Sequence, residues 1–153
     1  EADIAVRVTR FEGHEVFARK IGEMAIGIYA SKAYLERWNY VGPPKLVMVL
    51  DDQMHLPEVK WLRDMYPEAT YAIRSNSREV HLAAVRNGIG IAALGRFLAD
   101  DDPDLVRMNR GQPDLTREIW MGVHGDMRHM PRIRAVMDSL TQAIVANKAV
   151  LAP

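Results

Sequence analysis

The chain contains no cysteine among its 153 residues, which excludes disulfide bridges, thiolate metal sites and a cysteine nucleophile. It also lacks an excess of either charge, because 20 lysines and arginines balance 20 aspartates and glutamates. A domain that binds nucleic acid by itself normally carries a basic excess, so we do not expect this chain to bind DNA alone. No apolar run approaches the roughly 20 residues that cross a bilayer, and the acidic first residues are not a secretion signal. A cytoplasmic protein without membrane partners is the simpler interpretation.

The sequence also lacks a recognisable signature of catalysis or of metal binding. None of its five histidines stands in the H-E-x-x-H spacing, and no carboxylate cluster completes a metal site. His124 and His129, with Asp126 between them, come nearest, and we interpret them as polar loop residues. No G-x-S-x-G nucleophile elbow is present. We therefore expect no metal, no cofactor and no catalytic residue, and an enzyme hypothesis has only a generic cleft to support it.

What the sequence does contain is an alternation of strand-like apolar runs and short helical patterns. Strands are predicted at residues 4–8, 24–30, 46–50, 70–74, 89–94, 105–108 and 117–124. Helices are predicted to begin near Ala33, Pro57, Ser77 and Pro131. The last is the longest, and its apolar stripe consists of Ile133, Val136, Met137, Leu140 and Ile144. This alternation predicts an α/β fold with largely parallel or mixed sheets.

The segment from Ser75 to Leu94 reads as a capped helix, a glycine stop and a buried strand. Asn76 and Glu79 have the spacing of a capping box. Gly88 and Gly90 begin a G-x-G-x-x-A pattern, but a dinucleotide site needs those glycines between a strand and the helix that follows. Here the helix comes first, so we reject nucleotide binding. We expect Gly88 to end the helix and Gly90 to permit close packing.

Helix starts supply most of the candidate binding residues. The first N–H groups of a helix are unpaired and its dipole favours an anion, so Ser75, Asn76 and Ser77 are candidates for ligand contact. Simple helix capping is the alternative for these residues and for Ser31, which opens the first predicted helix. Arg7 lies within a strand, either as a solvent-facing or paired arginine or as a clamp for a carboxylate.

Several elements, in order, resemble the effector-binding domain of LysR-type transcriptional regulators. They are D-I-A-V-R at residues 3–7, G-I-Y-A-S-K-A-Y-L at 27–35, S-N at 75–76 and A-A-V-R-N-G-I-G-I-A at 83–92. The resemblance covers essentially the whole chain. Lys32 departs from it, because many members of the family carry proline at that position.

The resemblance implies two α/β lobes, like those of periplasmic binding proteins, with a small effector between them. Residues 11–108 would form the second lobe, residues 1–10 and 117–153 a partial first lobe, and residues 109–116 a crossover. In the family, two strand–helix units and a DNA-binding domain precede the Asp3–Arg7 strand. We therefore expect a fragment with an incomplete first lobe, which contacts DNA only through a domain absent from this chain.

Our leading hypothesis is an effector-sensing regulatory domain that binds a small, anionic molecule and works as a homo-oligomer. The residues expected to line its site are Arg7, Thr9, Ser31, Ser75, Asn76 and Ser77. The alternative is a solute-binding protein of a transport system, which has a related fold.

Overall fold

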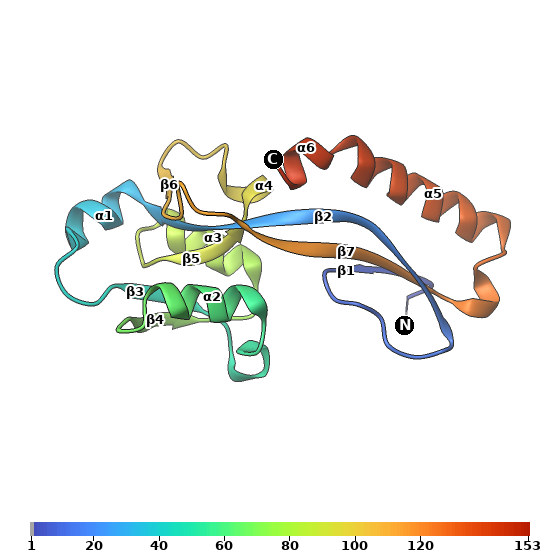
Figure 1. Ribbon diagram of the computed structural model, residues 1–153, viewed down its shortest axis with the longest axis horizontal. Helices are drawn as coiled ribbons and strands as arrows, with labels where there is room; N and C mark the ends of the chain where they lie inside the picture. Colours follow the sequence, from blue (N-terminus) through green and yellow to red (C-terminus); the bar gives the residue numbers. More distant parts are fainter. Residues whose placement is uncertain (1) are drawn as a thin grey trace. The chain divides into compact units, whose positions relative to one another are not determined.

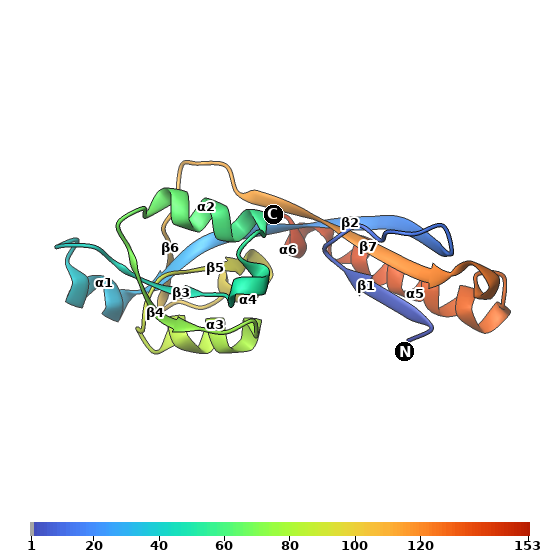
Figure 2. The same cartoon turned by 90° about the horizontal axis from the view of Figure 1, so that it is seen from below.

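The structure, a computed structural model, describes residues 2–153 and divides into two compact units (Figures 1 and 2). Unit 1 comprises the residues up to 25 together with 116–153, and unit 2 comprises residues 26–115. This division differs from the predicted lobe boundaries, because residues 11–25 lie in unit 1 and residues 109–115 in unit 2. The reason is one long strand, Val16–Ser31, whose first part packs in unit 1 and whose last part packs in unit 2.

Unit 1 is built from three antiparallel strands and a long helix. Its elements are β1 (Ile4–Arg7), the first part of β2 (Val16–Ser31), β7 (Leu115–His124), η2 (Gly125–Met127), α5 (Pro131–Ala146) and α6 (Lys148–Leu151). Strand β7 lies between β1 and β2, with Ile4 opposite Val123 in the register. The apolar pattern predicts only residues 24–30 of β2 as strand, because charged residues interrupt that pattern in residues 16–23.

Helix α5 packs its apolar stripe against the core of unit 1. The buried members of this core are Ile21, Ile119, Met121, Val123, Ile133 and Met137. Leu140 and Ile144 pack against it as predicted. Val136 does not, because its side chain is 48% exposed. At ~100° per residue, Val136 falls at the margin of the stripe that Ile133 and Met137 define.

Unit 2 contains the last part of β2 and a parallel βαβαβ arrangement. Its other elements are α1 (Lys32–Trp38), β3 (Lys45–Met48), η1 (Asp51–Gln53), α2 (Pro57–Met65), β4 (Thr70–Arg74), α3 (Arg78–Arg86), β5 (Ala92–Gly95), α4 (Arg96–Ala99) and β6 (Leu105–Arg107). Strands β3 and β4 are parallel, and a parallel bridge between Leu46 and Ile91 joins the start of β5 to β3. Strand β2 pairs antiparallel with β5 and β6.

This topology sets the direction of every strand end in unit 2. The carboxyl ends of β3, β4 and β5 lie at one edge, whereas the carboxyl end of β2 lies at the opposite edge. Figure 2 shows α2 and α3 on opposite sides of β3 and β5. Buried Val59 and Leu62 come from α2, and buried Ala84 and Val85 come from α3. Because helices cover both faces, β3 and β5 are apolar without alternation, as is typical of parallel strands.

Gly88 and Gly90 have the predicted structural roles. Gly88 has a φ of +69°, and the N–H groups of Gly88 and Ile89 donate to the carbonyls of Val85 and Ala84. This is the pattern of a Schellman motif that ends α3. At Gly90, an added Cβ would lie 2.6 Å from the carbonyl oxygen of Lys45. The absence of a side chain there lets the N–H of Ile91 donate to that carbonyl at 2.9 Å.

We predict that Gly90→Ala lowers the free energy of unfolding by about 1–3 kcal/mol, because the methyl group forces β5 away from the backbone of β3. Urea denaturation followed by circular dichroism measures the change. An unfolding free energy equal to that of the wild type would contradict the close approach of these two segments.

Candidate functional site

The candidate site lies at the edge of unit 2 where β3 and β4 end and α2 and α3 begin. The chain leaves β3 at Met48 and β4 at Arg74, and the N–H of Ser75 donates to the carbonyl of Met48 at 2.8 Å. The segments after both strands are thereby held side by side. In open α/β sheets this edge is where ligands bind, because helix N-termini and strand carboxyl ends converge there.

Asn76 uses its whole side-chain amide to fix this edge. Its Oδ1 accepts from the N–H of Leu50 at 2.9 Å. Its Nδ2 donates to both carboxylate oxygens of Asp52, at 3.0 and 3.1 Å. Asn76 therefore joins the segment after β4 to the segment after β3, and it shapes the edge as much as it presents a polar group.

The start of α3 differs from the prediction. Ser77, not Asn76, is the N-cap, and its hydroxyl oxygen accepts from the N–H of Val80 at 3.4 Å. The prediction of a capping box formed by Asn76 and Glu79 is wrong, because the side chain of Asn76 is occupied by hydrogen bonds to Leu50 and Asp52. The hydroxyl of Ser75 accepts from the N–H of Ser77 at 3.1 Å.

The two helix starts are tied together by an ion pair. Arg78, the first residue of α3, approaches Glu58 in the first turn of α2, with 3.4 Å between Nη2 and Oε1. Glu58 is only 5% exposed, so this carboxylate is buried between the helices. Its charge partly offsets the positive ends of both helix dipoles.

Two further carboxylates give the edge a mixed electrostatic character. Asp51 and Asp52 begin η1, shortly after the end of β3, and are exposed. Asp51 forms an ion pair with Arg74, whose Nε also donates to the carbonyl of Val49 at 3.0 Å. The edge thus offers hydrogen-bond donors at the start of α3 and carboxylate acceptors at η1. In the sequence, the only indication of these acceptors is a pair of acidic residues after the apolar run at residues 46–50. By itself, this pattern indicates only that the strand has ended.

His81 supports the site from beneath. It is 2% exposed, and its Nε2 shares a hydrogen bond with the carbonyl oxygen of Ser75. Burial lowers the pKa of the imidazole, and the nearby positive charge of Arg78 lowers it further, whereas the bond to Ser75 opposes both effects. The buried ring is therefore neutral near pH 7, and protonating it works against the fold.

Ser31 lies at the other end of unit 2. It is 2% exposed and caps α1, accepting from the N–H of Tyr34 at 3.1 Å. Its hydroxyl lies next to Gly88, at the C-terminal end of α3, whereas Ser77 caps the N-terminal end of the same helix. The structure therefore does not bring Ser31 together with Ser75, Asn76 and Ser77. The reason is the antiparallel direction of β2 relative to β5.

Arg7 and Thr9 belong to unit 1. Arg7 ends β1, and its guanidinium lies over the ring of Phe11, 3.7 Å from the centroid. One of its terminal nitrogens donates to the carbonyl of Arg10 at 3.3 Å. Both Arg7 and Thr9 are exposed. Their participation in an effector site stays a prediction.

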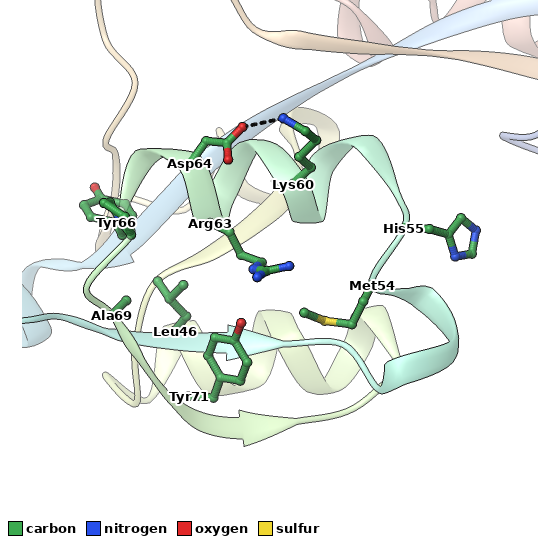
Figure 3. Close-up of a pocket in the computed structure, with 10 residues that line it drawn as sticks. Leu46, Met54, His55, Lys60, Arg63, Asp64, Tyr66, Ala69 and Tyr71 are labelled. Atoms are coloured by element: carbon green, nitrogen blue, oxygen red, sulfur yellow. Dashed lines mark hydrogen bonds and ion pairs between the residues drawn. The ribbon is translucent and has the colours of Figure 1, made fainter.

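A pocket of 580 Å³ in unit 2 contains none of the predicted residues. Figure 3 shows it between α2 and β4, with Arg63 of the helix pointing toward Tyr71 of the strand. Lys60 and Asp64 form an ion pair at its rim, at 2.8 Å. The lining of the pocket extends from Leu46 and Tyr71, which are register partners early in β3 and β4, to Met54 and His55, which precede the start of α2.

Residues 2–153 offer neither a metal site nor a membrane-spanning helix. No group of three or more histidine, aspartate or glutamate side chains in this range is placed to hold a metal ion. None of the helices in the same range has the length and apolar character that crossing a membrane requires.

Comparisons with known proteins identify the family. The model of the LysR substrate-binding domain matches residues 1–144, and the chain belongs to this family. The family is regulatory, and the predicted fold class, α/β with two lobes like periplasmic binding proteins, is confirmed. No curated protein matches the sequence significantly.

Solved structures with a similar fold include regulators from several bacteria. The CrgA regulatory domain of Neisseria meningitidis has a TM-score of 0.74 at 18% identity, covering 93% of this chain and 75% of that one. ArgP of Mycobacterium tuberculosis has a TM-score of 0.73 at 20% identity, with coverages of 94% and 51%. The CcmR regulatory domain of Synechocystis, solved in complex with 2-PG, has a TM-score of 0.71 at 12% identity, with coverages of 94% and 74%. The chain thus spans about three quarters of isolated regulatory domains and about half of longer regulators.

We predict that Asn76→Ala lowers the free energy of unfolding by about 1 kcal/mol, because the N–H of Leu50 and the carboxylate of Asp52 both lose their partner. Urea denaturation measures the change. Asn147→Ala is the control, since exposed Asn147 makes only a side-chain bond to Ala143 in its own helix, and its effect should stay within about 0.5 kcal/mol. Equal effects of the two substitutions would contradict a bridging role for Asn76.

We predict that stability declines as the pH falls below about 6.5, the ordinary pKa of histidine. The pKa of His81 is lower in the folded chain than in the unfolded chain, so the unfolded chain binds the proton first and gains population. Unfolding curves at pH 7.5 and 5.5 measure the loss, and His81→Gln should reduce it. If the variant lost as much stability as the wild type between these pH values, another group would be responsible.

Proposed function

We propose that this chain is the effector-sensing regulatory domain of a LysR-type transcriptional regulator, and that its effector contacts the edge formed by Ser75, Asn76 and Ser77. Family membership supports a sensor over an enzyme. The observation that carries the placement is the hydrogen-bonded junction of the β3 and β4 ends through Asn76, beside the start of α3.

The chemistry of this edge supports an effector with an anionic group. The N–H groups in the first turn of α3 and the hydroxyl of Ser77 are donors, and the helix dipole favours a carboxylate or phosphate there. Asp51 and Asp52 stand beside these donors, although Arg74 and Asn76 already engage them. An anionic effector that also carries a hydrogen-bond donor would therefore satisfy both sides of the edge.

Binding has to be coupled to a conformational difference for the chain to act as a sensor. An effector shifts an equilibrium between two arrangements only by the difference in its affinity for them. The junction at Asn76 is suited to transmit such a difference. Its hydrogen bonds join the segment between β4 and α3 to the segment between β3 and α2. The contribution of Arg7 and Thr9 from unit 1 stays part of this proposal.

The remaining features of the regulator are proposals of the same kind. The protein would be cytoplasmic and homo-oligomeric, and it would contact DNA through a further domain encoded in the same reading frame. A solute-binding protein of a transport system is the alternative with a related fold. An upstream helix-turn-helix in the reading frame would support the regulator, and an export signal would support the transport protein.

We predict that a calorimetric screen of small carboxylates against the protein encoded by the complete reading frame finds a ligand that binds saturably. Ser77→Gly should weaken the binding of this ligand about fivefold, because the substitution removes a hydroxyl group worth about 1 kcal/mol. The helix should still form, because glycine is tolerated at the N-cap position.

Asn87→Ala is the matched control, since Asn87 lies at the C-terminal end of the same helix and bonds only to Ala83. It should leave the affinity unchanged. Equal weakening by both variants, or binding that neither variant affects, would refute the placement at the start of α3.

A further inference from the structure

Unit 1 contains a second pocket, of 390 Å³, whose lining is strongly basic. Its polar lining consists of Arg19 from β2, Arg128 and His129 from the turn after η2, and Arg134 and Asp138 from α5. We call this set the arginine pocket. It shares no residue with the edge of unit 2 described above.

Alternation along β2 explains how one wall arises. Phe17 and Ile21 pack into the core beneath α5. Every second side chain of a strand faces the same side of the sheet, so Arg19 faces the same side as these two residues. Its guanidinium donates to the hydroxyl of Thr141 on α5 at 2.8 Å. Arg19, although exposed, is thus tied to the helix.

The opposite wall is arranged by an aromatic ring and a histidine. The guanidinium of Arg128 lies 5.0 Å from the centroid of the Phe17 ring. Its Nε donates to Nε2 of His129 at 2.9 Å. A guanidinium held in this way keeps its terminal N–H groups free for an acceptor, and Phe17 and Met137 add apolar surface to the pocket.

The charges of the arginine pocket are not balanced by the protein. Among the ion pairs of residues 2–153, none joins Arg19, Arg128 or Arg134 to a carboxylate, although Asp138 stands in the same lining. Asp126 is the acidic residue nearest to Arg128 along the chain, but its Oδ2 lies 3.8 Å from Nδ1 of His124. Three arginines therefore share one pocket with a single carboxylate, in a chain whose formal charge is zero.

The start of α5 adds to this positive potential. The helix begins at Pro131 with no side-chain cap and no acidic residue in its first turn. A 16-residue helix has a positive dipole end there, which favours an anion. The arginines, the helix start and the concave shape thus all favour the binding of an anion.

We propose that the arginine pocket binds a small multivalent oxyanion, either a phosphorylated molecule or a di- or tricarboxylate. Guanidinium groups bind both chemistries through paired N–H donors. A volume of 390 Å³ lies within the usual range for small-molecule sites, which is about 300–1,000 Å³. The pocket lies wholly in unit 1, so this site is independent of the effector site proposed above.

The test is isothermal titration calorimetry of the chain with pyrophosphate and with citrate at low ionic strength. We expect saturable binding of at least one of them at one site. Pyrophosphate alone would assign a phosphorylated ligand, and citrate alone a polycarboxylate. The double variant Arg19→Gln/Arg134→Gln should weaken binding about tenfold or more, because charge-assisted hydrogen bonds are lost.

Arg132→Gln is the matched control, because Arg132 is an exposed arginine of the same helix that does not line the pocket. Its affinity should stay within about twofold of the wild type, and thermal melting should verify that every variant is folded. Amide chemical shifts locate the ligand. Changes at residues 132–134 support the proposal, whereas changes confined to residues 77–80 overturn it. Absence of saturable binding, or equal weakening by Arg132→Gln, overturns it as well.

Discussion

The parallel alignment of β3, β4 and β5 is the constraint on which unit 2 depends. It consists of the bridge between Leu46 and Ile91 and of the pairing of β3 with β4, which runs from Lys45 opposite Thr70 to Met48 opposite Arg74. Once these strands run in one direction, the starts of α2 and α3 have to lie at the same edge as the strand ends. Asn76, Asp52 and the pair of Glu58 and Arg78 then join neighbours that are distant along the chain.

Close backbone contact makes that alignment possible. Gly90 lets β5 approach Lys45, and Gly88 lets α3 end where β5 has to begin. Both roles are local and predictable from the sequence, because a glycine directly after a helix is typical of a helix stop, and a glycine before a buried strand is typical of close backbone approach. The same segment carries the family resemblance, so the residues that identify the family here are partly those that build the sheet.

The two polar clusters of the chain differ in how the protein treats their charges. At the edge of unit 2, carboxylates and cations are mostly paired with each other, and a ligand has to exchange contacts with them. In the arginine pocket, a hydroxyl contacts Arg19 and an aromatic ring contacts Arg128, and neither of them nor Arg134 is paired with an acid among the described residues. The first arrangement is suited to selecting a ligand and to coupling its binding to a conformational change. The second is suited to attracting an anion.

The sequence by itself determined most of the elements, the α/β class and the family, because these depend on hydrophobic periodicity, glycines and ordered motifs within short windows. It placed β4 correctly at residues 70–74, and it placed the starts of α2 and α5 at their prolines. It did not determine that β2 begins as early as Val16, or that Asn76 bonds across to Leu50 instead of capping α3.

Only the tertiary structure decided which helix starts share an edge. Ser31 and Ser77 have the same local pattern, a strand end followed by a helix, and nothing within a short window distinguishes them. The direction of β2 against β5 places them at opposite ends of α3. The arginine pocket has the same origin, since residues 19, 128 and 134 meet only when β2 packs beneath α5. Strand direction and long-range packing are properties of the folded chain, and local periodicity does not encode them.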